Sequence, residues 1–97
     1  MAISEAEFKA ANGRMAERLE REPRAVTACY DLERDRVVIG LSTGVDVGFA
    51  PDKLQGLQGA TPAQLAQIEI SSTGFGLHFP KLDADFDLGG LLAVALF

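Results

Sequence analysis

Apolar residues near the start of the chain recur at steps of three and four, which is the spacing of one face of an α-helix. The stripe consists of Phe8, Ala11, Met15 and Leu19. Ser4 and Glu7 have the spacing of a capping box, and Pro23 ends the pattern. The pattern therefore predicts an N-terminal helix over residues 4–22 that packs on the rest of the protein along one narrow face.

From Ala25 onward the apolar period changes to two, which is typical of a β-strand. The pattern predicts strands over residues 25–31, 36–41 and 45–49, and Gly44 supplies a tight turn before the third strand. Strands joined by such short turns pair as an antiparallel meander. We expect the inward face to include Val26, Ala28, Tyr30, Val45, Val47 and Phe49. At least one helix should pack against this face.

The second half of the chain predicts shorter elements. Residues 52–57 form a short helix or turn, and Thr61 begins another short helix with a second capping box. Residues 68–70 and 77–79 alternate like strands, and residues 83–87 form an acidic loop.

A C-terminal helix completes this order, because the leucines and alanines of residues 88–97 have helical spacing. We therefore predict an α+β fold, with a three-stranded antiparallel meander, two short strands, and N-terminal, central and C-terminal helices. Residues 1–22 are the N-terminal helix, and residues 23–97 are a single α+β domain.

Composition and charge limit the possible functions. The 97 residues are 47% hydrophobic, which excludes disorder along the whole chain. The net charge is -5, and it arises after residue 24, where nine acidic residues face only four basic ones. A nucleic-acid-binding protein usually carries a basic face, so we expect no direct contact with nucleic acid.

Candidate catalytic residues are few. Cys29 is the only cysteine and His78 the only histidine, so neither a cysteine metal site nor a pair of histidine ligands can form. His78 lies beside Phe79, and we interpret it as a structural histidine at the edge of the core. We expect no enzyme activity and no cofactor. The sequence shows no signal peptide and no apolar run of the roughly 20 residues that span a membrane, so we expect a cytoplasmic protein.

Three alternating aspartates, Asp83, Asp85 and Asp87, have the spacing that begins a calcium-binding EF-hand loop. That loop also requires a glycine and a closing glutamate, but Leu88 and Val94 occupy those positions. We therefore expect no metal site. Asp87 instead precedes the C-terminal helix, where an acidic residue is favourable.

The C-terminal segment carries no polar side chain over its last seven residues. A helix this apolar is either buried in its own domain, beneath Phe8 and Met15, or covered by a partner, or continued by further chain. We expect a symmetric homodimer, because two-fold dimers are the commonest soluble oligomers. The candidate partner-binding residues combine the aspartates with this segment: Asp83, Asp85, Asp87, Leu91, Leu92, Leu96 and Phe97.

Residues 23–92 resemble a bacterial family of unknown function, number 2442. The carrying segments are Ala25-Val26, Tyr30-Asp31, Val37-Val38, Leu41 to Gly44, Phe49 to Pro51, Ala60 to Pro62, Leu65, Ile68 to Ile70, Gly76 to Asp85 and Leu91-Leu92. The resemblance implies a small α+β domain on an antiparallel sheet, and family members are often proposed to be antitoxins. Some members add a helix-turn-helix or a basic tail, neither of which occurs in this sequence.

Two functions remain open. The first is an antitoxin-like, non-enzymatic module that binds and masks a basic partner protein, since opposite charges speed association. The second is an inhibitor encoded by a phage or mobile element, similar to an anti-CRISPR protein, whose acidic surface imitates nucleic acid and blocks a defence complex. A small enzyme built on His78 and the aspartates is disfavoured, because no catalytic constellation is complete.

Overall fold

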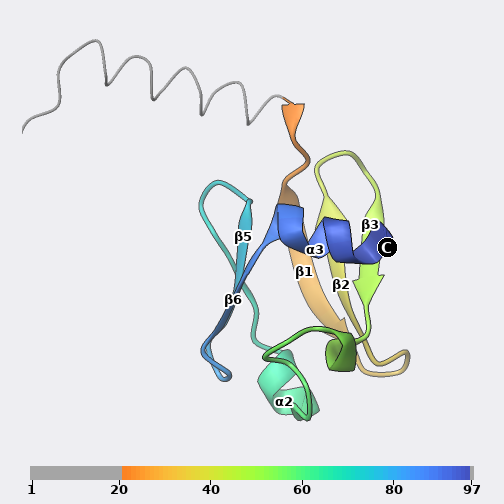
Figure 1. Cartoon of the computed structure of the whole chain (residues 1–97), viewed down its shortest axis with the longest axis vertical. Helices are drawn as coiled ribbons and strands as arrows, with labels where there is room; N and C mark the ends of the chain where they lie inside the picture. Colours follow the sequence, from red (N-terminus) through yellow and green to blue (C-terminus); the bar gives the residue numbers. More distant parts are fainter. Residues whose placement is uncertain (1–20, 97) are drawn as a thin grey trace, which may run out of the picture.

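The computed structural model describes residues 21–96, and side chains as far as Val94. These residues form two three-stranded antiparallel sheets that lie side by side, with helix α3 crossing in front of the first sheet (Figure 1). The α+β class is therefore confirmed. Apart from its last residues, the predicted N-terminal helix lies outside the described part of the chain.

The first sheet has the strand order β1-β2-β3, with β1 at Ala25–Asp31, β2 at Arg36–Leu41 and β3 at Asp46–Phe49. This is the predicted meander. Its inward positions include Tyr30 and Ala28, which pack against the core, and Phe49, which is buried.

The prediction was wrong for Val26 and Val45, whose side chains are 58% and 55% exposed. A β-bulge between Ala25 and Thr27 inserts Val26 as an extra residue. Ala25 is therefore the buried residue at the start of β1, and Ala28 regains the inward face after the bulge. Val45 lies between the turn at residues 42–44 and the start of β3.

The second sheet has the order β4-β5-β6, with β4 at Glu69–Ile70, β5 at Gly76–Phe79 and β6 at Ala84–Asp87. The first two are the predicted short strands. Strand β6 corrects the predicted acidic loop, because residues 84–87 pair along the whole of β5. Only Asp83, at a φ of 48°, stays in the turn.

Short helical segments close the connections between the sheets. The 3₁₀-helix η1 spans Pro51–Lys53, and α2 spans Pro62–Leu65. The predicted capping box is present, because the Thr61 and Gln64 side chains bond reciprocally to each other's backbone N–H. Helix α3 spans Leu88–Leu96. Among the described helices, none has the length and apolar character needed to cross a membrane.

The two sheets share one core. The N–H of Ala25 donates to the carbonyl of Gly74 at 2.8 Å, which ties β1 to the turn before β5. Leu88 donates to the carbonyl of Phe75 and so fixes the start of α3 on the second sheet. The buried cluster takes residues from both sheets, from the segment after η1 and from helices α2 and α3: Ala25, Val37, Ile39, Leu41, Phe49, Leu54, Leu57, Leu65, Leu77, Phe79, Leu88 and Leu91.

Candidate protein-binding groove

Strand β6 places acidic and apolar side chains on opposite faces of the second sheet. Successive side chains of a strand alternate between faces, so Asp85 and Asp87 point outward while Phe86 points inward. Phe86 meets Phe79 edge to face, with ring centres 5.7 Å apart and an interplanar angle of 86°. This contact holds β6 against the core and fixes the direction of both carboxylates.

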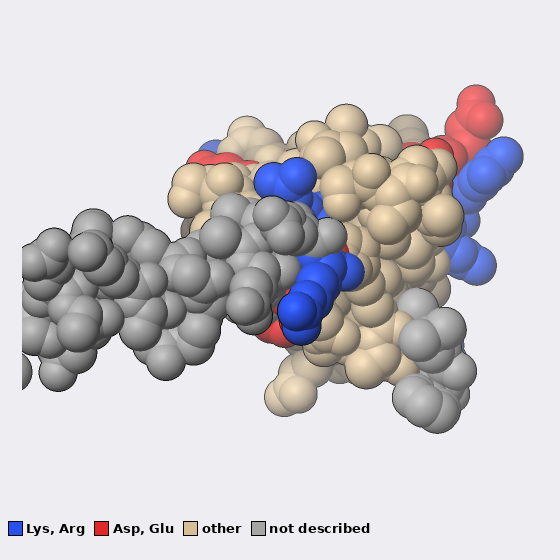
Figure 2. Space-filling model, turned by 90° about the horizontal axis from the view of Figure 1, so that it is seen from above, with Lys and Arg blue, Asp and Glu red and all other residues tan. Residues whose placement is uncertain are grey.

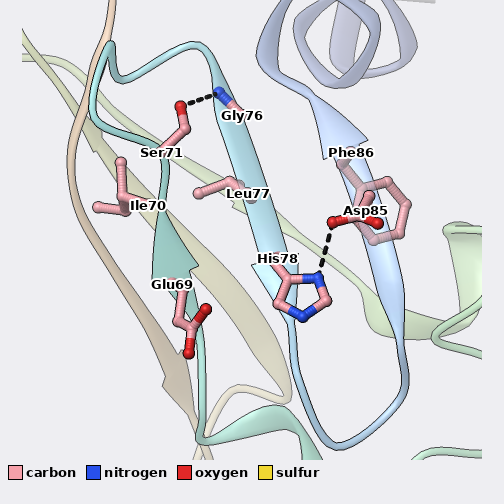
Figure 3. A pocket seen from close by; sticks show the side chains of 8 residues that line it. All are labelled: Glu69, Ile70, Ser71, Gly76, Leu77, His78, Asp85 and Phe86. Carbon is pink, nitrogen blue, oxygen red and sulfur yellow. Dashed lines mark hydrogen bonds and ion pairs between the residues drawn. The ribbon is translucent and has the colours of Figure 1, made fainter.

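The outer face of this sheet carries a cross-strand row of Glu69, His78 and Asp85 (Figure 3). His78 Nδ1 lies 2.7 Å from Asp85 Oδ1, and the imidazole is only 35% exposed. A shallow hollow of about 240 Å³ lies here, with Ser71 and Gly76 at its upper end. Asp85 is thus the side-chain partner of His78, and whether His78 has only a structural role stays a prediction.

A second hollow, of about 380 Å³, lies between β6, the first turns of α3 and the segment after η1. We call it the acidic groove. Its lining residues are Lys53, Leu54, Gln55, Asp85, Phe86, Asp87, Gly90, Leu91 and Val94. Leu54 and Leu91 are buried and form an apolar floor, whereas the two aspartates stand exposed along one wall.

The start of α3 shapes one end of this groove. Asp87 Oδ2 accepts a hydrogen bond from the N–H of Gly90 at 3.2 Å, so Asp87 caps the helix as predicted. A side chain at Gly90 would meet no atom within 4 Å, which shows open space beside the helix. One turn later Val94 borders the same space and is 54% exposed.

The structure brings together part of the predicted partner-binding set. Asp85, Asp87 and Leu91 line the acidic groove, whereas Asp83 lies in the β5–β6 turn and does not. Leu92 packs against the core. Phe97 and the Leu96 side chain lie outside the described part of the structure.

Sequence reasoning missed Leu54, Phe86 and Val94 as groove residues. The alternation of Ala84-Asp85-Phe86-Asp87 fits a strand with one acidic and one apolar face, and interpreting it as a strand instead of a loop would have identified Phe86. Nothing in the sequence indicated that Leu54 meets β6 and α3, because this contact depends on how the chain returns from the first sheet.

Among the charged residues that the structure describes, acidic residues outnumber basic ones. After β1 begins, the basic residues are Arg34, Arg36, Lys53 and Lys81. Seen from above, the described surface is largely uncharged, and its basic side chains form separate groups rather than one continuous patch (Figure 2). Among the described residues, no three histidine, cysteine, aspartate or glutamate side chains are grouped so that they could hold a metal ion.

Comparison with known proteins identifies the family. Residues 26–96 match the family described as "Protein of unknown function (DUF2442)". The chain belongs to this family. The match covers nearly all of the described residues, including both sheets and α3, so the acidic groove lies entirely within the family domain.

Two solved structures of uncharacterised proteins share this fold. A crystal structure from Rhodospirillum rubrum is 45% identical, covers 75% of this chain and 88% of its own, and has a TM-score of 0.72. A solution structure from Chromobacterium violaceum is 37% identical, covers 98% of this chain and 87% of its own, and has a TM-score of 0.73. The search of curated proteins returned no match.

Proposed function

We propose that this protein is a non-enzymatic binding module, antitoxin-like in action, that masks a basic partner protein. The observation that carries the proposal is the acidic groove, in which exposed carboxylates stand beside an apolar floor. Protein-binding sites typically combine a buried apolar anchor point with a polar rim. The groove has both parts, and its volume suits a few inserted side chains.

The charge of the chain supports a basic partner. The net charge is -5, and a positively charged protein would be steered toward this surface from a distance. Such steering raises the association rate, and the apolar floor then slows dissociation. A toxin that acts on RNA has the required basic surface, because it must itself bind phosphates.

The apolar floor also separates this proposal from nucleic-acid mimicry. A mimic presents carboxylates in place of phosphates and requires no hydrophobic pocket between them. In the acidic groove, Leu54 and Leu91 lie beside Asp85 and Asp87. This combination favours an inserted apolar side chain of a partner over occupation of a nucleic-acid channel.

Co-expression tests the proposal. The products of the genes beside the one for this chain are expressed singly in a bacterial host, and growth is followed with and without this chain. We expect one neighbouring product to arrest growth, this chain to restore it, and the two proteins to copurify as a stable complex. Growth arrest by no neighbour, or arrest that this chain does not relieve, would contradict an antitoxin-like function.

A further inference from the structure

We infer that the acidic groove binds a partner segment of defined chemistry: one apolar side chain flanked by arginine or lysine. This inference deepens the proposed function and rests on it for the identity of the partner as a protein. The apolar side chain inserts over Leu54 and beside Val94, and the cationic group pairs with Asp85 and Asp87.

The apolar part of the groove is prepared for an inserted side chain. Leu54 and Leu91 are 5% and 4% exposed, so they form a packed floor, and Val94 leaves 54% of its surface in water beside them. Gly90 leaves the helix surface bare, which lets a second backbone approach α3 closely. An apolar side chain placed here would cover Val94 and replace water over the floor.

The carboxylates of Asp85 and Asp87 are placed so that they can bind a cation. Asp85 and Asp87 point the same way from one strand, and two strand residues span about 7 Å. Each carboxylate is already oriented, Asp85 by His78 and Asp87 by the N–H of Gly90. A carboxylate has roughly four acceptor positions, so the bond from His78 leaves Asp85 able to accept a forked guanidinium.

Lys53 and Gln55 also line the groove. The ammonium group of Lys53 repels a second cation, so the cation of a bound segment is expected to lie toward the aspartates of β6. Electrostatic patterns of this kind fix orientation and reject wrong partners.

A second copy of this chain is a poor occupant of the same groove. A two-fold dimer is self-complementary, so groove-to-groove pairing would bring Asp85 and Asp87 of both copies together. Like charges in such close contact destabilise an interface. The charge pattern therefore favours a different, basic protein.

The probe is a pair of short amphipathic peptides that share one leucine. In the first, arginines flank the leucine; in the second, glutamates replace the arginines. Binding to the full chain is measured by NMR titration. We expect the arginine peptide to shift the signals of Leu54, Phe86, Gly90, Leu91 and Val94, and the glutamate peptide to leave them unchanged.

Matched variants locate the interaction. Val94→Ser and the double change Asp85→Asn with Asp87→Asn should each weaken binding of the arginine peptide about tenfold, which is the effect of losing roughly one charge-assisted bond or one apolar contact. Val45→Ser is the control for Val94, since its side chain is exposed to the same degree, and Asp83→Asn is the control for the aspartates. His78→Ala keeps the carboxylate of Asp85 but removes the group that orients it, so it should weaken binding less than the double change does.

Several results would overturn the inference. The first is equal binding of the two peptides, and the second is a set of NMR shifts confined to the outer face around Glu69 and His78. The third is a loss of peptide affinity in Val45→Ser equal to that in Val94→Ser. The fourth is a homodimer, formed without peptide, that Val94→Ser dissociates. Failure of the proposed function is separate. If the groove variants still restore growth, the groove inference is wrong and the proposed function stands. If the peptide results hold but this chain restores growth against no neighbouring product, the proposed function is wrong and the groove inference stands.

Discussion

At the scale of single residues, a hydrogen bond to Asp35 controls the ionisation of Tyr30. Its hydroxyl donates a hydrogen bond of 2.5 Å to Asp35 Oδ1 in the turn between β1 and β2. This bond, together with partial desolvation and the negative charges of Asp35, Asp31 and Asp52, raises the pKa of the Tyr30 phenol above its usual value of 10.0. Every one of these effects disfavours the phenolate.

We predict that this pKa is directly measurable. Tyr30 is the only tyrosine and the chain has no tryptophan, so the ultraviolet absorbance of the phenolate reports Tyr30 alone. The midpoint should lie above that of a tyrosine in the unfolded chain. Asp35→Asn should lower it, because the substitution removes the charge while asparagine also tolerates the φ of 54° at this position.

The control and the pH dependence follow from the same bond. Asp83 also has a positive φ and lies in the β5–β6 turn of the second sheet, so Asp83→Asn should leave the Tyr30 midpoint unchanged.

Because the pKa of Tyr30 is raised in the folded state, the contribution of Tyr30 to stability is present below pH 10 and is lost as the pH rises through the folded-state pKa. A midpoint that Asp35→Asn does not move would contradict this account.

At the scale of elements, the first sheet depends on a glycine in its central strand. Gly40 of β2 lies between Thr27 of β1 and Asp46 of β3. A Cβ atom at this position would overlap Thr27 Oγ1 and would lie 3.3 Å from Asp46 Oδ1. The side chains of Thr27 and Asp46 thus occupy the space that a side chain at residue 40 would need.

We predict that Gly40→Ala destabilises the domain by about 1–3 kcal/mol, because the added methyl group forces Thr27 out of its position. Thr27→Ala removes the atom that the methyl group meets. The double variant should therefore be more stable than the sum of the two single changes indicates. Urea denaturation of all four proteins measures this coupling, and additive effects would show that the contact with Thr27 is not the cause.

A second prediction concerns the junction of β6 and α3. Asp87→Ala removes the side chain that accepts from the N–H of Gly90 and should cost about 1 kcal/mol in the free energy of unfolding. Asp87→Asn keeps an acceptor oxygen and should retain most of the stability. Thermal unfolding compares the two, and equal losses would indicate that the charge of Asp87, not its capping bond, supports the helix.

The elements also show where sequence reasoning succeeds. The meander and the Thr61 capping box depend on local spacing and turn residues, and both were predicted. Strand β6 was missed because aspartate is unfavourable in strands and the acidic run suggested a loop. Pairing with β5 and the contact of Phe86 with Phe79 override that local preference.

The bulge at Val26 was missed for a related reason. One inserted residue reverses the faces of the residues before it, and a period of two in the sequence cannot show where that residue lies. Of the candidate site, the aspartates and Leu91 could be predicted from composition and apolar runs. The positions of Lys53 and Leu54 in the groove depend on the tertiary packing of the segment around η1.

At the scale of the whole molecule, α3 divides its surface between the core and solvent. Leu88 and Leu91 are buried, whereas Ala93 and Val94 are exposed. At 100° per residue, Ala93 lies nearly opposite Leu91 on the helix and does not line the acidic groove. A homodimer formed through the Ala93 side of α3 would avoid the carboxylates of the groove and leave it open to a partner.

We predict that the full chain forms such a homodimer, because its last seven residues carry no polar side chain. Sedimentation should give a mass near twice 10.3 kDa. Ala93→Asp should yield a folded monomer that still binds the arginine peptide, since the new carboxylate lies away from the groove. Leu91→Asp should unfold the domain instead, because it buries an unpaired charge. A monomer at high protein concentration, or an Ala93→Asp variant that remains dimeric, would show that α3 is not the dimer interface.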